Sequence, residues 1–477
     1  MAADPRLFAR LLEDDATTGP VYRRIAEAIA TAVTTGSLSA GDRLPTHREL
    51  ARELGVAVPT VSRAYREAEE QGLVTSTVGR GTFVAGASGI PHLRDTPAPG
   101  ESSGPVRLDM AVNAPARGRH EEMLRRTLAT FAASADLGAL LGYEPDIGSR
   151  EHRHGASRWL ARSGVEAGPD QVAICHGSQH ALLVAFGAAL RAGETLLTES
   201  LTYPGAKSAA QLLGIGRSAV AMDDEGLIPE ALEEACAATP AARALYCMPT
   251  AHNPTTATLP LARREAIAGI ARRHDLIIVE DDAFGLLSDH TGLPPLAALA
   301  PERTLFLTSL SKTLAPGLRC GFLAGPPELA GRLGALIRAT VFNPAPLATA
   351  VALSWLGDGT ADRLLDWQRQ EMRRRRTATV NLLAGTPAIS AVRADALHAW
   401  VELREPWTAS EVLALAEGHG ISLGPTLYFS ATEEPSPRAV RMCLGNAPDV
   451  GTLTGALRTL ADALARGRPA WAANTRV

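Results

Sequence analysis

Apolar residues recur at helical spacing near the start of the chain. Between Val21 and Val33 every fourth residue is apolar, and Gly36 follows, which predicts a helix over residues 21–35. Thr46 and Glu49 then form a capping-box pattern, in which each side chain can satisfy a free N–H of the first turn. A second helix is therefore expected from this box to Gly55.

A third helix and a hairpin complete this first region. Pro59 suits a first helical turn, and the helix is expected to run to Gly72. Residues 73–76 and 82–84 are short strand-like runs on either side of a Gly79-Arg80-Gly81 turn. Three helices followed by a β-hairpin describe a winged helix-turn-helix, which is a DNA-binding arrangement.

The composition changes after the hairpin. Residues 85–106 are crowded with Gly, Pro and Ser and keep no apolar period, as is typical of a flexible linker. We therefore expect a DNA-binding domain at 1–84, a linker at 85–106 and a large domain at 107–477.

The large domain alternates short apolar runs with helical segments. Seven β-rich runs lie at 172–175, 195–198, 218–222, 243–247, 276–280, 304–308 and 320–324. This alternation predicts an α/β fold with a mainly parallel sheet that is covered on both faces. In such sheets ligands bind at the carboxyl ends of the strands.

Polar residues follow four of those runs. Ser178 and Gln179 stand in a turn that opens a helix, where free N–H groups and the helix dipole favour an anion. Asn253 follows the run at 243–247, Asp281 follows the run at 276–280, and Lys312 lies among hydroxyl residues after the run at 304–308. We expect these side chains to meet at one edge of the sheet.

Lysine usage singles out one of these residues. The chain has 47 Lys plus Arg residues, of which only Lys207 and Lys312 are lysines. A buried lysine can lose its proton and form a Schiff base, whereas arginine stays protonated. The combination of Lys312 with a nearby carboxylate and a nearby anion site predicts a site for pyridoxal 5′-phosphate (PLP). Lys207 is expected on a helix surface.

Both halves of the chain resemble known families. The DNA-binding domain of GntR regulators is resembled by one segment, RLPTHRELARELGVAVPTVSRAYREAEEQGLVTSTVGRGTFVAG. Residues 107–477 resemble fold-type I aminotransferases of class I/II, which implies a seven-stranded sheet. The whole chain resembles the MocR subfamily of GntR regulators. The resemblance implies Lys312 as the Schiff-base lysine and Asp281 as the partner of the pyridine nitrogen. Asp282 is the alternative if the strand is one residue longer.

The resemblance implies further ligands. Asn253 would bond the ring hydroxyl, Tyr203 would stack on the ring, and Tyr143 matches a tyrosine that reaches the phosphate from the neighbouring subunit. Arg441 matches the arginine that binds an amino acid's carboxylate, and Asn113 stands in the segment beside the ligand. The phosphate would be held by Ser178, Gln179, Ser309, Ser311 and Arg319.

The chain departs from the family pattern at three places. Phe284 replaces a tyrosine whose hydroxyl tunes the ring oxygen, and Thr256 replaces the glycine of Asn-Pro-Thr-Gly. The ligand-side segment reads Asn113-Ala114-Pro115-Ala116 instead of the commoner Gly/Pro/Asp pattern. Transaminase activity is therefore expected to be weak or absent.

DNA contacts are expected on the second helix, the third helix and the hairpin tip. Residues 20–86 hold eight Arg against seven Asp plus Glu, so tight binding requires a dimer with well-placed contacts. Val58 stands where many relatives carry an arginine. The candidate contacts are Arg43, Arg48, Thr60, Ser62, Arg63, Arg66 and Arg80.

These expectations combine into a cytoplasmic regulator that binds double-stranded DNA. Its large domain would sense an amino compound, or PLP itself, through the aldimine of Lys312, and the family resemblance suggests a head-to-tail homodimer. The alternative is a catalytically active aminotransferase with an accessory DNA-binding domain.

Three other features of the sequence do not indicate a function. No stretch approaches the ~20 apolar residues that span a bilayer, and the scattered Cys and His residues suggest no metal site. The run Arg373–Arg376 is expected to be solvated or at an interface.

Overall fold

The computed structural model describes residues 7–8, 21–34, 37–38, 42–70, 74–77, 81–84, 108–134, 137–290, 292–431 and 437–467. The chain divides into two compact units, Met1–Thr96 and Pro97–Val477. Residues 85–106, where the linker is expected, and Arg80 at the hairpin tip lie outside the described residues.

The first unit has the predicted order of three helices and a hairpin. These are α2 (Val21–Thr34), α3 (His47–Leu54), α4 (Val58–Glu70) and the antiparallel strands β1 (Val74–Thr77) and β2 (Gly81–Val84). The capping box is confirmed, since the Thr46 hydroxyl accepts from the Glu49 N–H at 3.3 Å and the Glu49 carboxylate accepts from the Thr46 N–H at 2.8 Å. Gly55 ends α3 at φ 63°, a left-handed conformation that favours glycine.

The core of the first unit explains why its helices hold together. Ile25 and Ile29 of α2 pack with Leu50 of α3 and with Val61 and Tyr65 of α4, and all five side chains are buried. The Tyr65 hydroxyl donates to the main-chain oxygen of Pro45 at 2.7 Å, which ties α4 to the segment that leads into α3.

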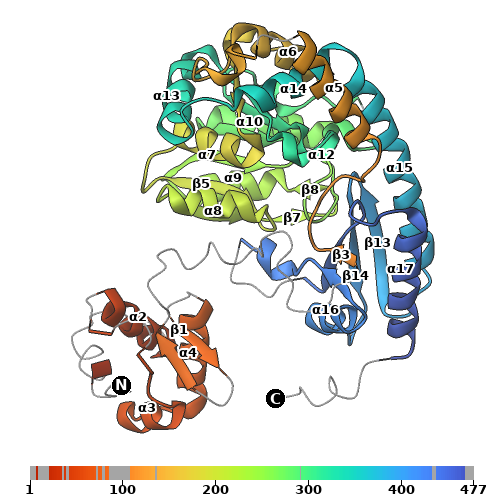
Figure 1. The fold of residues 1–477 in the computed structure, drawn as a ribbon. Coiled ribbons are helices and arrows are strands. Elements are labelled where there is room, and N and C mark those ends of the chain that lie inside the picture. The colour runs from red at the N-terminus through yellow and green to blue at the C-terminus, as the bar shows by residue number, and fades with distance from the viewer. Residues whose placement is uncertain are drawn as a thin grey trace. The chain divides into compact units, whose positions relative to one another are not determined.

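A seven-stranded sheet forms the centre of the second unit (Figure 1). Its strands lie in the order β4-β12-β11-β10-β9-β5-β6, and only β12 runs antiparallel to its neighbours. The predicted mainly parallel sheet is therefore confirmed. Its strands are β4 (Val172–Cys175), β5 (Thr195–Glu199), β6 (Gly216–Val220), β9 (Ala242–Cys247), β10 (Ile277–Asp281), β11 (Thr304–Ser309) and β12 (Gly321–Ala324).

Alternate residues of the central strands face two separate apolar clusters. Leu196 and Val279 belong to a large cluster with the helices on one face, and Leu197 and Ile278 belong to a smaller cluster on the other face. The helices of this part are α5 (His120–Ser134), α6 (Arg150–Ala161), α7 (Gly177–Ala189), α8 (Pro204–Leu212), α9 (Pro229–Ala238), α10 (Leu261–Arg273), α11 (Leu296–Leu299), α12 (Leu310–Thr313), α13 (Ala330–Thr340) and α14 (Pro346–Gly357), with the short pair β7 (Met222–Asp223) and β8 (Gly226–Leu227).

The C-terminal part of the second unit forms smaller sheets beside the long helix α15 (Thr360–Leu383). Strands β13 (Ile389–Asp395), β14 (His398–Leu403) and β16 (Ala439–Cys443) are antiparallel. Strand β3 (Leu108–Met110), the first described element after residue 84, pairs with β15 (Ile421–Leu423), so the orange strand lies among blue C-terminal elements in Figure 1. The remaining helices are α16 (Ala409–Gly418) and α17 (Val450–Ala465). None of the described helices is long and apolar enough to cross a membrane.

Candidate functional site

Lys312 lies at the carboxyl end of the large sheet, in the short helix α12 that directly follows β11. Its Nζ donates to the main-chain oxygen of Asn113, in the segment after β3. Burial lowers the pKa of Lys312 to about 8; Cys443 and Asp281 oppose this change, and Arg441 adds to it. A substantial fraction of the amine is therefore neutral near pH 8, and the neutral amine is the form that attacks a carbonyl carbon.

Asp281 ends β10 and is 2% exposed. One carboxylate oxygen, Oδ2, accepts from the Tyr246 hydroxyl at 2.9 Å, while the buried Oδ1 has no hydrogen-bond partner among the described residues. Burial raises the pKa of Asp281 to about 7, although the Tyr246 hydrogen bond lowers it. The orphaned oxygen is an open acceptor for a cationic donor.

The two acidic neighbours of Asp281 have other partners. Glu280 accepts from the N–H groups of Leu296 and Ala297 at 3.0 and 2.8 Å, at the start of α11. Asp282 bonds to Ser163 and to the Gly285 N–H, and burial raises its pKa. This geometry favours Asp281 over Asp282 as the group that faces Lys312.

Arg441 of β16 and Asn253 after β9 lie in direct contact. Arg441 Nη1 donates to Asn253 Oδ1 at 2.8 Å, Nη2 donates to the Ala111 oxygen, and the guanidinium lies 4.7 Å from the centre of the Phe429 ring. The buried Nε of Arg441 has no partner within the described part of the chain. The N–H of this buried Nε is thus available to an additional acceptor.

Hydroxyl groups gather at the start of α7. Ser178 Oγ donates to Ser309 Oγ at 2.7 Å, and the buried Ser311 Oγ lacks a partner in the described ranges. Arg319 donates to the His176 oxygen at 3.2 Å and lies so close to Gly177 that a Cβ there would meet its Nη2 at 2.6 Å. Gly177 has φ 78°, a left-handed conformation that favours glycine at this turn.

Tyr203 precedes α8 and is half-buried. Burial, followed by the charge of Asp281, raises the pKa of Tyr203 and keeps the phenol neutral. Gln179 donates to the Gly205 oxygen at 2.8 Å, and a Cβ on Gly205 would lie 2.4 Å from the Tyr203 ring. Gln179 thus holds the turn that carries Tyr203, a contact that the sequence had not indicated.

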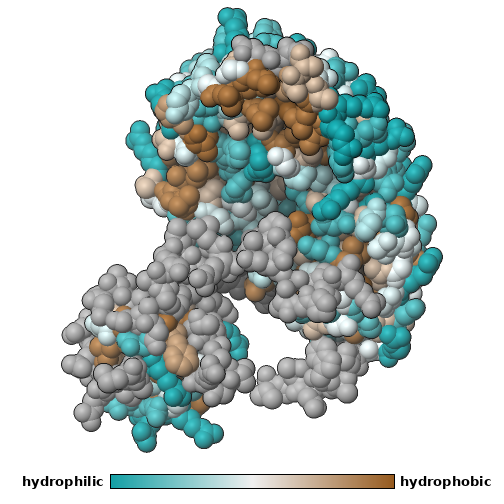
Figure 2. Space-filling view, viewed as in Figure 1, coloured by the Kyte–Doolittle hydropathy of each residue, from teal (hydrophilic) through white to brown (hydrophobic). Residues whose placement is uncertain are grey.

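Tyr143 is 86% exposed, so it does not join the enclosed cluster of its own chain. Its ring lies 4.9 Å from the ring of Phe342, which is 51% exposed and has φ 70°. Figure 2 shows apolar residues gathered on the end of the second unit that carries α5, α6, α13 and α14. The exposed side chains of this apolar face are Leu124, Leu128, Leu137, Leu141, Tyr143, Val341, Phe342 and Leu347.

Sequence reasoning missed Tyr246 and His398. Tyr246 pairs with Val279 in the register of β9 on β10, which places its hydroxyl on Asp281. His398 is fully buried on β14, 5.4 Å from the Phe284 ring, and bonds to Asn113. No motif announces either residue, because both contacts join segments distant in sequence. Across the described ranges, no three His, Cys, Asp or Glu side chains gather in a group that could hold a metal ion.

The expected solvent exposure was wrong for two residues of the run Arg373–Arg376. Arg375 and Arg376 are 1% and 5% exposed, because their guanidinium groups donate to the main-chain oxygens of Leu444, Gly445, Ala447 and Ala396. Arg373 and Arg374 of the same run are solvated, as expected. Lys207 is half-buried and donates to the Ser430 oxygen at 2.9 Å. These cations satisfy main-chain oxygens where strands and helices end.

The predicted DNA-contacting residues belong to the first unit, and those that the structure describes differ in exposure and in their side-chain contacts. Arg43, Arg48, Arg63 and Arg66 are exposed, and Val58, at the start of α4, is 40% exposed. The Arg63 guanidinium lies 3.8 Å from the centre of the Tyr22 ring and donates to the Tyr22 hydroxyl at 3.1 Å. Thr60 is half-buried, as is Ser62, which bonds to His47 Nδ1 at 2.9 Å.

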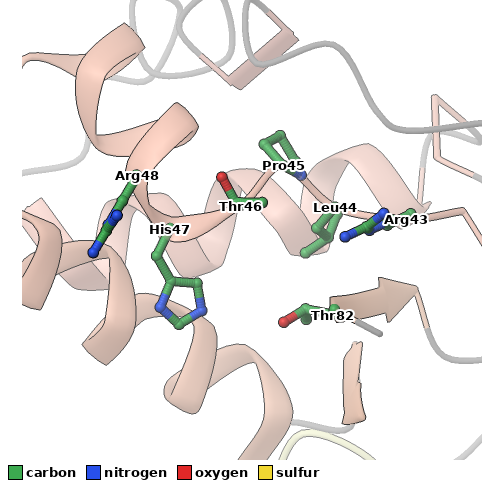
Figure 3. A pocket seen from close by; sticks show the side chains of 8 residues that line it. Arg43, Leu44, Pro45, Thr46, His47, Arg48 and Thr82 are labelled. Carbon is green, nitrogen blue, oxygen red and sulfur yellow. The ribbon is translucent and has the colours of Figure 1, made fainter. Parts of the chain in front are cut away.

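A pocket of about 400 Å³ opens at the start of α3. Figure 3 shows Arg43 and Arg48 on opposite sides of it, with Thr46, His47 and Thr82 between them. Two exposed arginines beside the start of a helix suit a phosphate group.

Comparison with known proteins identifies both units. The family "Aminotransferase class I and II" matches residues 106–460, and the family "Bacterial regulatory proteins, gntR family" matches residues 21–84. The HTH-type transcriptional regulator TauR of Rhodobacter capsulatus is 31% identical, over 75% of this chain and 78% of TauR. The HTH-type pyridoxine biosynthesis transcriptional regulator PdxR of Corynebacterium glutamicum is 29% identical, over 76% of this chain and 79% of PdxR.

Among solved structures, LysN of Thermus thermophilus resembles the second unit. LysN is an alpha-aminoadipate aminotransferase complexed with N-(5′-phosphopyridoxyl)-L-leucine, and it matches with a TM-score of 0.69 and 25% identity over 79% of this chain and 95% of LysN. The chain belongs to the aminotransferase class I and II family and carries a gntR-family DNA-binding domain ahead of it, which is the composition of the MocR subfamily.

Proposed function

We propose that this chain is a PLP-dependent transcriptional regulator that binds DNA through its first unit and senses a small amino compound in its second. The observation that carries this proposal is the presence, in one chain, of a gntR-family domain with exposed arginines and a half-buried Lys312 of lowered pKa. TauR and PdxR, which match most of the chain, are named as transcriptional regulators. We place the linker between the two units at residues 85–106, the Gly-, Pro- and Ser-rich part of the sequence.

The orphaned polar atoms around Lys312 fit PLP. Asp281 Oδ1 would accept from the protonated pyridine nitrogen, Tyr203 would stack on the ring and Asn253 would bond the ring hydroxyl. The phosphate would meet the α7 N-terminus and the unpaired hydroxyl of Ser311, with help from the side chains of Ser178, Gln179, Ser309 and Arg319. PLP supplies, when bound, an aldehyde that condenses with a primary amine and a ring that withdraws electrons.

Arg441 indicates a carboxylate on the effector. Its buried Nε–H lacks an acceptor among the described residues, and a guanidinium fork suits a carboxylate. An amino compound with a carboxylate would therefore place its amine toward Lys312 while its acid group meets Arg441 in place of the Ala111 oxygen. PLP alone would leave this N–H unpaired.

The apolar face around Tyr143 supports a homodimer. Exposed apolar groups of this size mark protein interfaces, and Tyr143 lies in this face together with Phe342. A head-to-tail pair would let Tyr143 of each subunit reach the phosphate of the other. Two first units would then meet two half-sites on DNA.

Retention of the catalytic set favours a second candidate, an active aminotransferase. Lys312, Asp281 and Arg441 are all in place, but Phe284 offers no hydroxyl and is 2% exposed against His398. We expect an amine to bind and exchange with Lys312, and expect turnover with a 2-oxo acid to be slow.

One experiment separates these two functions. The full chain, loaded with PLP, is mixed with DNA from upstream of its own gene while amino acids and 2-oxo acids are added. The proposal expects specific DNA binding that an amino acid alters. Rapid turnover of an amino acid and a 2-oxo acid without any DNA binding would establish the enzyme instead.

A further inference from the structure

We propose that the side-chain amide oxygen of Asn113 receives a hydrogen-bond donor on the effector's own side chain, so that this chain selects a donor-bearing amino acid. The inference rests on the proposed function, because it concerns the amino acid that meets Lys312 and Arg441. It adds a third contact point to the amine and the carboxylate.

The segment that carries Asn113 lies between those two contact points. Asp109 Oδ1 accepts from the N–H groups of Ala111 and Val112, at 2.8 and 3.2 Å, and so forms a tight turn after β3. The turn directs the Ala111 oxygen to Arg441 and the Asn113 oxygen to Lys312 Nζ. Asn113 therefore stands beside the position where an effector's α-carbon must lie.

His398 sets the orientation of the Asn113 amide. His398 Nε2 lies 3.2 Å from the His252 main-chain oxygen, which can only accept, so Nε2 carries the proton. His398 Nδ1, 3.2 Å from the Asn113 amide, must then accept, and Asn113 therefore presents its NH₂ to His398. Burial, and after it the charge of Arg441, lowers the pKa of His398 to about 3, which keeps this tautomer neutral.

This orientation leaves Asn113 Oδ1 without a partner among the described residues. Asn113 is only 9% exposed, and its Oδ1 accepts no hydrogen bond from them. Buried acceptors are nearly always satisfied, so an orphaned one beside a ligand site indicates a missing donor. Covalent geometry keeps Oδ1 within roughly 5 Å of the main-chain oxygen that holds Lys312 Nζ.

The donor must come from the effector's side chain. When the α-amine of an amino acid exchanges with Lys312, it is consumed and the Lys312 amine is released, and the structure already provides that amine with an acceptor, the Asn113 main-chain oxygen. The effector's carboxylate has no N–H or O–H to give, so its side chain is the group left to donate to Asn113 Oδ1. A hydroxyl, amide or ammonium group on a short side chain satisfies Asn113 Oδ1, whereas a methyl group leaves it unpaired.

The test measures selectivity in the PLP-loaded full chain. L-alanine, L-serine and L-2,4-diaminobutyrate are titrated separately, and each Kd is read from the cofactor absorption band and from calorimetry. The expected result is that L-serine or L-2,4-diaminobutyrate binds about 5- to 10-fold more tightly than L-alanine, the value of one buried hydrogen bond. The Asn113→Ala variant should bring the Kd ratio to within about 2-fold of one by weakening the donor-bearing ligand alone.

Matched variants separate recognition from structure. Asn446→Ala removes a different side-chain amide that bonds to this segment, since Asn446 Nδ2 donates to the Val112 oxygen at 2.9 Å, and it should keep the Kd ratio. His398→Gln supplies one acceptor and one donor and should restore part of the selectivity that His398→Leu removes. Asn113→Gly provides a second test should the alanine variant fold poorly.

Three results would overturn the inference. The first is that L-alanine binds as tightly as both donor-bearing ligands. The second is that Asn113→Ala weakens all three ligands equally, which would assign the amide to the α-amine or to the fold. The third is that the selectivity survives in Asn113→Ala. A parent protein whose band responds to no amino acid would refute the proposed function itself, and the inference with it.

Discussion

Asp281→Asn tests the centre of the cofactor site, because the substitution removes a charge and keeps the shape. Asparagine retains an oxygen for the Tyr246 hydroxyl, which donates to Asp281 Oδ2 at 2.9 Å. The change places an NH₂ group at the position of the orphaned Oδ1. It should therefore oppose a protonated pyridine nitrogen while relieving a buried negative charge.

The magnitude follows from the pKa of Asp281, which burial raises from 3.8 to about 7. Because the folded-state pKa lies above the unfolded value, stability is lost as pH rises from about 4 to about 7. At about 1.4 kcal/mol per pH unit, the cofactor-free chain gives up about 4 kcal/mol by pH 8. Asp281→Asn should recover much of this at pH 8 and little at pH 4, and should weaken PLP binding about 10- to 100-fold through loss of a charged hydrogen bond.

Two measurements check this prediction. Urea unfolding of the cofactor-free parent and variant at pH 4 and pH 8 gives the stability difference, and titration with PLP gives both dissociation constants. Asp282→Asn is the matched control, since Asp282 bonds to Ser163 instead of facing Lys312, and it should leave PLP affinity unchanged. Equal PLP affinity in Asp281→Asn and the parent, or a larger loss in Asp282→Asn, would refute the assignment.

Three further predictions concern other parts of the chain. Phe284→Tyr should speed amino transfer to a 2-oxo acid and shift the pH at which the cofactor band titrates, measured by absorbance; an unchanged pH profile would show that the new hydroxyl does not reach the ring oxygen. Arg48→Ala should weaken DNA binding, lower the salt slope of that binding by about one and leave stability unchanged. Arg63→Ala should also destabilise the first unit by about 0.5–1 kcal/mol, because Arg63 stacks on Tyr22. DNA titrations at several salt concentrations measure the binding effects and thermal unfolding measures the stability, and identical unfolding of the two variants would contradict the stacking. Arg375→Met should destabilise the second unit by about 3–5 kcal/mol, since it leaves three main-chain oxygens unpaired, and a midpoint in urea equal to that of the parent would show that these bonds contribute little.

The elements and their chemistry could largely be predicted, because local signals specify them. The Thr46 capping box, the seven strands and the position of Lys312 after β11 depend on residues close in sequence. Several boundaries moved by one or two residues: β6 covers Gly216–Val220 instead of 218–222, β1 covers Val74–Thr77 instead of 73–76, and α4 begins at Val58, one residue before Pro59. Helix ends are ambiguous at this level because neighbouring residues can serve equally well as the first turn.

Contacts between distant segments could not be predicted. The charge run on α15 was expected to be solvated. Arg375 is nevertheless buried, because the loop that follows β16 places three main-chain oxygens around its guanidinium. The bond between His398 and Asn113 joins residues 285 positions apart. Such pairs depend on the order of strands and on how the C-terminal sheets meet β3, which no local period encodes.

The most direct test of the central claim measures DNA affinity and cofactor chemistry in the same sample. PLP-loaded full chain is titrated with DNA from upstream of its gene, with and without an amino acid that converts the cofactor band. The account predicts that this amino acid changes the Kd for DNA in the parent and leaves it unchanged in Lys312→Ala. Full conversion of the band with no change in the parent's Kd for DNA would contradict it.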